Sequence, residues 1–276
     1  MGGPMADHVF LAGFDLVVFN RTPEKSEKYR EKGLAVAQSL EAIGEECDQV
    51  FLCVRATEDV EECVRALART ARSGTLIVDH STILPEAAEK LHGELKKRSL
   101  RFVDAPITGG SMGAVKGALT VFCGGEPEAI EDAKPVMSAY AKRVERVGGP
   151  GAGQLMKAAN QIAVAGSLLA LCEALAFAEK AGLELAQTRD LLSGGAAGSW
   201  AFENYGPKIV AGDWSPGFTV DNQIKDLEYC EQAARAAKAW VPGTELVHKL
   251  LREMRSEGEG ARTTAALFEK LKRAGG

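Results

Sequence analysis

The first half of the chain alternates short apolar runs with longer amphipathic segments, and this alternation restricts the fold more than any other feature. The apolar runs have the length of buried strands and cover residues 16–19, 50–54, 75–78, 101–103 and 119–122. Helical periodicity marks segments between them, at residues 23–32, 57–71 and 85–97. Such an alternation predicts an α/β fold, doubly wound around a parallel sheet.

The second half of the chain contains no convincing strand. Residues 154–180 have the pattern of one long helix, and further helices are predicted over 221–239, 244–255 and 263–273. The turn Gly148-Gly149-Pro150-Gly151 separates the two halves. The sequence therefore predicts two domains, an α/β domain over residues 1–149 and an all-helical domain over residues 150–276.

Composition narrows the class of protein. The 276 residues can build two domains with real cores, and the net charge of −5 comes from interspersed charges, which argues against nucleic acid as a partner. Six cysteines without a CxxC pair predict reduced thiols in a cytoplasmic protein, and four histidines without metal-ligand spacing predict no metal site. The apolar stretch 162–171 is about half a bilayer span, so a core and not a membrane is expected around it.

Small, polar or charged residues follow four of the predicted strands. Ligands in open α/β sheets bind outside the carboxyl ends of the strands. The residues found there are Asn20-Arg21-Thr22, Arg55, Asp79-His80-Ser81-Thr82, and the segment from Asp104 to Gly110. Asn, Thr and Gly are also ordinary turn residues, so one such loop means little. Four loops at one edge favour a ligand site.

The chain begins with a helical pattern that leads directly into the first strand. Met5, Val9 and Phe10 fall at helical spacing, and a helix that feeds a buried strand is the second half of a βαβ unit. Gly2 is well placed to be the last glycine of a dinucleotide fingerprint, which allows close helix–strand packing. The strand and the first two glycines of that fingerprint would lie upstream of Met1.

The stretch "GPGAGQLMKAANQ" opens the long helix. Its glycines do not form a fingerprint, because Met156 stands at the third position, and they are expected to be a flexible lead into the helix. Lys157, Asn160 and Gln161 share one helix face at i, i+3 and i+4, next to the domain boundary, where clefts form. A lysine near a helix end also commonly extends to solvent. Spacing alone leaves both interpretations of Lys157 open.

Five motifs, in order along essentially the whole chain, resemble those of the β-hydroxyacid dehydrogenase family, the relatives of 3-hydroxyisobutyrate dehydrogenase and tartronate semialdehyde reductase. They are "MGGPMA", "DHST" followed by Pro85, "DAPITGGSMGAVKGALTVFCGG", "GAGQLMKAANQ" and "IKDLEYC". The segments "KAANQ", "SGGAAGSW" and "SPGFTVDNQIKDL" are most similar to the tartronate semialdehyde reductase branch. The resemblance implies a Rossmann-type sheet whose first strand is absent here, and we expect the native gene to begin upstream.

The resemblance also implies a reaction and a site. Hydride would pass between a nicotinamide cofactor and a small hydroxy acid or semialdehyde acid, with Lys157 as the proton donor and acceptor. Asn160 and Gln161 would orient the reacting group, although the family commonly has Asn where Gln161 stands. The substrate carboxylate would meet Thr108, Gly109 and Gly110. The residues expected on the cofactor side are Gly2, Asn20, Arg21, Thr22, Val54, Arg55, Thr82 and Lys225.

The strand end at Asn20 predicts the choice of cofactor. NAD enzymes usually present an acid there to the ribose 2′-hydroxyl, whereas this chain has Asn20 followed by Arg21 and Thr22. Arg21 can pair with a 2′-phosphate and Thr22 can hydrogen-bond it, so NADP(H) is predicted over NAD(H), with NAD(H) possible. The alternative is that Arg21 is a solvated surface charge. Arg55, where the family usually has proline, is either a further phosphate contact or a solvent-facing side chain.

Two other functions stay open at this point. An imine reductase would share the fold, but those relatives generally carry aspartate or tyrosine at the position of Lys157. A non-catalytic binding scaffold is favoured by the missing strand and disfavoured by Lys157. The long helix is more apolar than one domain face needs, and the resemblance implies the dimers or tetramers that the family forms. A homodimer or homotetramer is therefore predicted.

Overall fold

The long helix α8 (Ala152–Lys180) belongs to both compact units of the protein. The computed structural model describes residues 1–215 and 217–274 and divides into Met1–Lys157 and Ala158–Gly276. These are called unit 1 and unit 2 below. The units therefore meet inside α8, whereas the boundary predicted from the sequence, between residues 149 and 150, lies before the helix begins.

Unit 1 is built on a six-stranded sheet. Its strands, in spatial order, are β3 (Gln49–Leu52), β4 (Leu76–Asp79), β5 (Arg101–Asp104), β7 (Leu119–Gly124) and β6 (Ile107–Thr108), with β8 (Ala141–Gly148) also paired to β7. The first three strands are parallel and in register, while β7 runs antiparallel to β5 and β6. The predicted parallel α/β core is thus confirmed, and the sheet turns mixed beyond β5.

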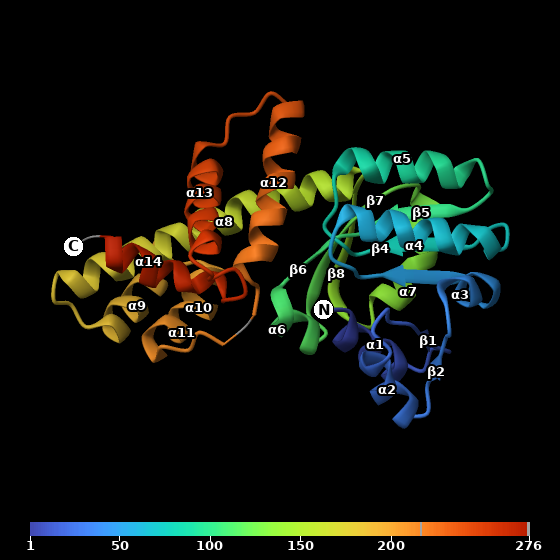
Figure 1. Ribbon diagram of the computed structural model, residues 1–276, viewed down its shortest axis with the longest axis horizontal. Coiled ribbons are helices and arrows are strands. Elements are labelled where there is room, and N and C mark those ends of the chain that lie inside the picture. The colour runs from blue at the N-terminus through green and yellow to red at the C-terminus, as the bar shows by residue number, and fades with distance from the viewer. Residues whose placement is uncertain (216, 275–276) are drawn as a thin grey trace. The chain divides into compact units, whose positions relative to one another are not determined.

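The central strand β4 is buried on both faces, which is why it contains no polar residue before Asp79. Leu76 and Val78 belong to one core cluster and Ile77 to the other. Helices α4 (Thr57–Thr70) and α5 (Pro85–Lys96) supply the second cluster, and α7 (Pro127–Met137) supplies the first. Helices on both faces of the sheet make this a doubly wound unit (Figure 1).

A second, smaller sheet stands apart from the first. It consists of β1 (Val17–Val18) and β2 (Ala35–Val36), paired in parallel and accompanied by α1 (Gly2–Leu11) and α2 (Glu24–Glu31), whereas α3 (Leu40–Glu46), which follows β2, packs against α4 (Figure 1). Among the described residues, no strand lies between β1 and β3. A cavity of about 900 Å³ occupies that place, lined by residues of both strands. The sheet is therefore interrupted where the resemblance predicts a strand.

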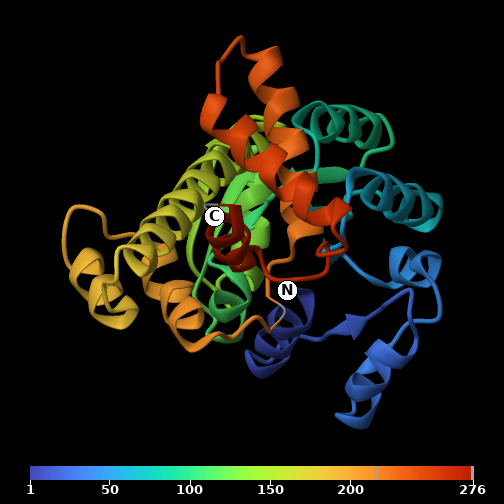
Figure 2. The ribbon, with the colours of Figure 1, turned by 60° about the vertical axis from the view of Figure 1, so that its left-hand side comes forward.

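Unit 2 is helical throughout its described residues. Besides α8 it contains α9 (Leu185–Ser193), α10 (Trp200–Asn204), α11 (Gly206–Ala211), α12 (Val220–Ala236), α13 (Pro242–Ser256), a 3-10 turn (Thr264–Ala266) and α14 (Leu267–Ala274). Helices α12 and α13 lie side by side as a hairpin in both views (Figures 1 and 2). The long helices agree with the prediction, whereas α9 to α11 were not anticipated.

The middle of α8 forms the core of unit 2. Leu168, Leu171 and Leu175 are fully buried among side chains of α12, α13 and α14. By length and composition alone α8 could also cross a bilayer. Within the stretch 162–171, however, Ala165, Leu168 and Leu171 are buried in the core of the unit, as the sequence predicted.

Helix α6 (Gly110–Val115) and the glycines before it complete unit 1. Gly109 and Gly110 have φ values of +120° and +65°, which side chains with a Cβ rarely adopt. The chain can therefore turn sharply between β6 and α6 only because both residues are glycine.

Candidate functional site

Six of the residues predicted to bind cofactor line the 900 Å³ cavity of unit 1. They are Gly2, Asn20, Arg21, Thr22, Val54 and Arg55. The last five follow β1 and β3, so the cavity opens at the carboxyl ends of these strands. Thr82 follows β4 at the same edge but is not among the lining residues, and Lys225 belongs to unit 2.

The turn after β1 has a defined local structure. The Asn20 side-chain oxygen accepts the Thr22 backbone N–H at 2.9 Å, which is an Asx turn. Arg21, between them, is 81% exposed and reaches the Asp59 carboxylate at 3.3 Å. Arg21 is thus a solvated side chain that also lines the cavity, and its pairing with a 2′-phosphate stays a prediction.

Gly2 lies at the first turn of α1, against the end of β3. A Cβ on Gly2 would lie 3.3 Å from the Cβ of Cys53, which is tighter than most real contacts. The glycine therefore allows α1 to pack closely on the strand end, as the last glycine of a dinucleotide fingerprint does.

His80 and Tyr140 form a buried pair on the wall of the same cavity. The His80 Nδ1 lies 2.6 Å from the Ala105 carbonyl oxygen, which can only accept, so Nδ1 carries the proton. Nε2 consequently accepts from the Tyr140 hydroxyl at 2.8 Å. Burial lowers the pKa of His80 to about 4, so the ring is neutral. This pair ties the end of β4 to the segment that follows β5.

Asp104, at the end of β5, holds the beginning of α8. One carboxylate oxygen accepts the Gly151 N–H at 2.9 Å, and the other accepts the Gln154 N–H at 3.0 Å. Burial raises the pKa of the Asp104 carboxyl to about 6, although these backbone donors oppose the rise. The carboxylate thus occupies the amino end of a long helix dipole.

Gln154 extends the same anchor to β4. Its side-chain oxygen accepts the Ile83 N–H at 3.1 Å, and its amide nitrogen donates to the Ser81 carbonyl oxygen at 2.8 Å. The Ser81 hydroxyl in turn accepts the Val54 N–H at 2.9 Å. The ends of β3 and β4 and the first turn of α8 therefore form one hydrogen-bonded assembly.

The glycines before and within α8 are closely packed. A Cβ on Gly153 would lie 2.5 Å from the carbonyl oxygens of Asp104 and Phe122. The expectation of a flexible lead into the helix is wrong, because Gly153 lets the helix approach the sheet closely and the Gly151 N–H is bonded to Asp104.

Lys157 is buried one turn further along α8, with 8% of its surface exposed. Its Nζ donates to the carbonyl oxygen of Ile107 at 2.9 Å. Ile107 and Thr108 make up β6, and Gly109 and Gly110 follow directly. The structure therefore brings Lys157 to the segment that contains the predicted substrate residues, and it does not extend to solvent.

Asn160 and Gln161 lie on α8 within unit 2. The Asn160 amide nitrogen donates to the Gln161 side-chain oxygen at 2.9 Å, and the Gln161 amide nitrogen donates to Asp226 at 2.7 Å. Lys225 forms an ion pair with Asp226 at 3.0 Å. Three predicted site residues of unit 2 are thus joined through Asp226, a residue that was not predicted.

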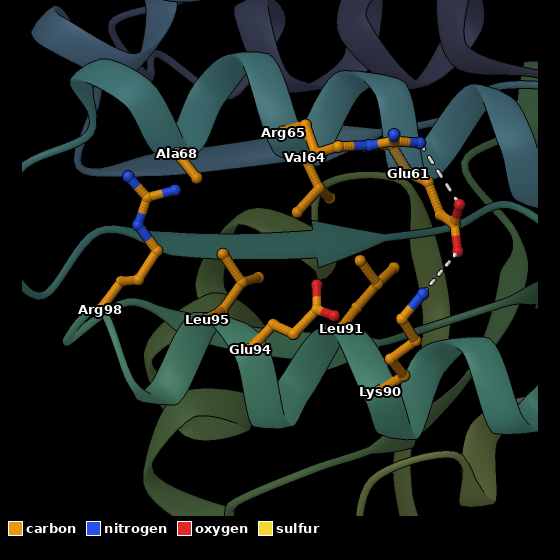
Figure 3. Close-up of a pocket in the computed structure, with 9 residues that line it drawn as sticks. All are labelled: Glu61, Val64, Arg65, Ala68, Lys90, Leu91, Glu94, Leu95 and Arg98. Atoms are coloured by element: carbon orange, nitrogen blue, oxygen red, sulfur yellow. Dashed lines mark hydrogen bonds and ion pairs between the residues drawn. The ribbon is translucent and has the colours of Figure 1, made fainter.

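A smaller groove of about 220 Å³ lies between α4 and α5 (Figure 3). Val64, Leu91 and Leu95 form its apolar floor. Glu61 pairs with both Arg65 and Lys90 along one side. None of the predicted site residues lies there, and the groove is the seam between two surface helices.

Three residues organise the site without having been given a role by the sequence: His80 and Asp104, which it placed at the strand ends, and Asp226, which it did not single out. Each has a polar side chain next to a predicted site segment, and two of them end a buried strand or follow one. A polar side chain at the end of a buried strand indicates a functional role. The sequence does not reveal its hydrogen-bond partners, however, because they come from elements far away along the chain.

Comparisons with known proteins agree over the whole chain. Residues 1–149 match the family model described as the NAD binding domain of 6-phosphogluconate dehydrogenase. Residues 151–271 match the model described as NAD-binding of NADP-dependent 3-hydroxyisobutyrate dehydrogenase.

Individual relatives are similar along most of their length. A probable mitochondrial 3-hydroxyisobutyrate dehydrogenase-like protein of Arabidopsis thaliana is 35% identical, over 99% of this chain and 83% of the relative. The 2-hydroxy-3-oxopropionate reductase of Escherichia coli is 32% identical, over 98% of this chain and 94% of the relative. A structure of Mycobacterium tuberculosis 3-hydroxyisobutyrate dehydrogenase with L-serine is 27% identical, with a TM-score of 0.89 over 99% of this chain and 96% of that one.

Proposed function

Because the chain belongs to the β-hydroxyacid dehydrogenase family, we propose that it transfers a hydride between NADP(H) and a small β-hydroxy acid, with Lys157 as the proton donor and acceptor. Family membership makes it an NAD(P)-dependent β-hydroxyacid dehydrogenase. The preference for NADP(H), the identity of the acid and the roles of single residues are our proposals.

The cavity of unit 1 fits a pyridine nucleotide in its chemistry. Arg21, Arg55 and Thr22 are among the residues that line it, and cations and hydroxyls are the groups that bind phosphates. The bound nicotinamide supplies or takes up the hydride. The protein contributes binding, orientation and the proton.

The contact between Lys157 and Ile107 is the observation that carries the proposal. Lys157 is almost fully buried, and its Nζ donates to the backbone carbonyl of Ile107, directly before Thr108. In the reducing direction the ammonium would polarise the substrate carbonyl and protonate the developing alkoxide. In the oxidising direction the neutral amine would take the hydroxyl proton. Such assistance typically contributes about 10²–10⁴ in rate.

The preference for NADP(H) is supported by the turn after β1. The residue that follows β1 at this place is Asn20, whose side-chain oxygen is used within the turn, and not the acid that would bind a ribose 2′-hydroxyl. Arg21 lines the cavity next to this turn and offers the positive charge that a 2′-phosphate needs.

Replacement of Lys157 tests the proposed chemistry. We expect Lys157→Met to lower kcat by about 10²-fold or more, because it removes the proton donor while keeping the length of the side chain. Lys180→Met, at the exposed end of the same helix, should leave kcat unchanged. Steady-state NADPH oxidation with tartronate semialdehyde, succinic semialdehyde and glyoxylate measures both variants. Unchanged turnover in Lys157→Met would refute the role of the lysine.

The same assay with a cyclic imine as a fourth substrate separates the other candidate functions. A cyclic imine as the only productive substrate would indicate an imine reductase. No turnover of any substrate, in a protein that binds NADPH, would indicate a binding scaffold.

A further inference from the structure

Gln161 has an unusual set of partners for a residue expected to touch substrate. Its side chain is 4% exposed, inside unit 2. Both ends of the amide are used within the protein, since Nε2 donates to Asp226 and Oε1 accepts from Asn160. Gln161 therefore has little left to offer a ligand directly, and its effect has to pass through a neighbour.

The charge of Asp226 determines which way both amides point. Asp226 pairs with the Lys225 ammonium at 3.0 Å, and a carboxylate can only accept hydrogen bonds. Gln161 must therefore turn its NH₂ group to Asp226 and its oxygen to the other side. That oxygen also only accepts, so Asn160 must turn its NH₂ group to Gln161. The Asn160 side-chain oxygen consequently faces away from Gln161.

We propose that Gln161 is a positioning residue that holds the Asn160 side-chain oxygen towards the substrate, so that the site selects β-hydroxy acids with a hydrogen-bond donor on the carbon next to the reacting one. The donor would be a hydroxyl or an ammonium group. This inference rests on the proposed function, because Lys157 is taken as the acceptor of the hydroxyl proton and Asn160 as a substrate contact. The spacing of Lys157 and Asn160 on one face of α8 supports that assumption.

The chemistry of the reaction explains why the donor belongs to the neighbouring carbon. The proton of the reacting hydroxyl goes to Lys157, so this hydroxyl has no second proton to give to Asn160. An acceptor beside Lys157 is satisfied only by another donor on the substrate. A methyl group in that place would leave the Asn160 oxygen without a partner, and sites built this way discriminate strongly against the analogue that lacks the donor.

Three acids that differ only in one group test the proposal. Glycerate, serine and 3-hydroxyisobutyrate carry a hydroxyl, an ammonium and a methyl group on the carbon next to the reacting one. With NADP⁺, we expect kcat/KM for glycerate or serine to exceed that for 3-hydroxyisobutyrate at least tenfold. In Gln161→Met the ratio of the kcat/KM values should fall to within about threefold of one, because the Asn160 amide is then free to rotate by 180°. The change should lie mainly in KM. Gln187→Met, exposed on α9, is the matched control and should keep the native ratio.

Exchanging the amide and the carboxylate between positions 161 and 226 should restore the orientation of the Asn160 amide. Gln161→Glu alone places two carboxylates together and should abolish the discrimination. Adding Asp226→Asn lets the new amide donate to Glu at position 161, whose carboxylate still accepts from Asn160. The double variant should therefore recover a preference of at least fivefold. A role in stability alone would not make the substrate ratio return, and thermal melting of each variant reports stability separately.

Binding provides the readout that does not depend on turnover. Titration calorimetry of the three acids into the NADP⁺-loaded protein should give the same order of affinity. If the acids bind in this order without turnover, the proposed proton chemistry fails and the inference stands. If the native ratio is near one, if Gln161→Met and the double variant both leave it unchanged, or if none of the acids binds, the inference is overturned.

Discussion

Arg21 pairs with the Asp59 carboxylate, and in the proposed complex it would also pair with the 2′-phosphate of the cofactor. Its contact with Asp59 is a single long ion pair on an exposed side chain, and such pairs contribute little to stability. A 2′-phosphate would therefore compete with Asp59 for Arg21 at little cost. Asp59 also lines the cavity, so its carboxylate would repel the phosphate.

Asp59 is thus predicted to limit the preference for NADP(H). Asp59→Asn should raise the ratio of kcat/KM for NADPH over NADH by about threefold to tenfold, and Arg21→Ala should lower it by at least as much. Asp48→Asn, which removes an exposed partner of Arg72, is the control. Equal ratios in the native chain and in Arg21→Ala would rule out the assignment of the 2′-phosphate to this turn.

At the scale of elements, the ends of β4 and β5 carry two buried groups whose titrations oppose each other. His80 has a pKa lowered to about 4, so its contribution to stability is present above pH 6.5 and is lost as the pH falls towards 4. Asp104 has a pKa raised to about 6, so its ionisation costs stability above pH 6, and this cost disappears as the pH falls towards 3.8. Each amounts to about 3 kcal/mol, and the two nearly cancel.

Substituting each residue alone should reveal how the other one changes the free energy of unfolding with pH. Relative to the native chain, the free energy of unfolding of His80→Gln should rise by about 3 kcal/mol between pH 7 and pH 4, and that of Asp104→Asn should fall by about 3 kcal/mol. Urea unfolding of the ligand-free protein at several pH values measures both. Parallel pH curves for all three proteins would contradict the assignment.

The first turn of α8 offers a comparison within one helix. Gly153→Ala should destabilise unit 1 by about 2–3 kcal/mol, because the new methyl group would lie 2.5 Å from two carbonyl oxygens. Gly166→Ala, where nothing lies within 4 Å, should stabilise the helix by about 0.5–1 kcal/mol. Denaturant unfolding gives both signs, and a neutral Gly153→Ala would show that the helix start can move off the sheet.

Elements with strong periodicity were predictable, and those defined by their partners were not. The strand β4 could be predicted because it is buried on both faces and therefore stands out as an apolar run. Its observed bounds differ by only one residue at each end from the predicted 75–78. β8 was missed because half of its residues are charged and exposed, and it is a strand only through pairing with β7. The helices α9 to α11 are short and have few buried residues.

The site divides in the same way. The placing of Arg21 and Thr22 after a strand, and of Lys157 on one helix face with Asn160 and Gln161, could be predicted from strand ends and helix spacing, whereas their roles stay predictions. The role of Asp104 could not, since its two donors lie 47 and 50 residues further along the chain. Gln161 was predicted to contact the substrate. Nothing in the sequence revealed that its amide nitrogen donates to Asp226, 65 residues away.

At the scale of the whole molecule, unit 2 exposes several large apolar side chains. Phe177 and Leu191 are 71% and 72% exposed, and Leu183 and Trp240 are also exposed. Scattered apolar side chains are common on surfaces, and unit 1 exposes some as well, but Phe177, Leu183 and Leu191 follow one another along the chain from the end of α8 into α9.

We expect these side chains to contribute to a homodimer or homotetramer. Sedimentation should give the mass of two or more chains, and Phe177→Glu should shift it towards one chain, because a buried carboxylate at an interface is costly. Leu11→Glu, an equally exposed position of unit 1, should not. A native mass of one chain would contradict the expectation.

The separation of β1 and β2 from the larger sheet has a consequence for folding. A pair of two-residue strands is marginal by itself, so its amide protons should exchange with deuterium far sooner than those of β4. This pair also carries the turn from Asn20 to Thr22 at the rim of the cavity. A nucleotide that spans the gap would close this local opening, so that exchange at residues 17–36 should slow with the concentration of NADP⁺ while exchange at residues 76–79 stays constant.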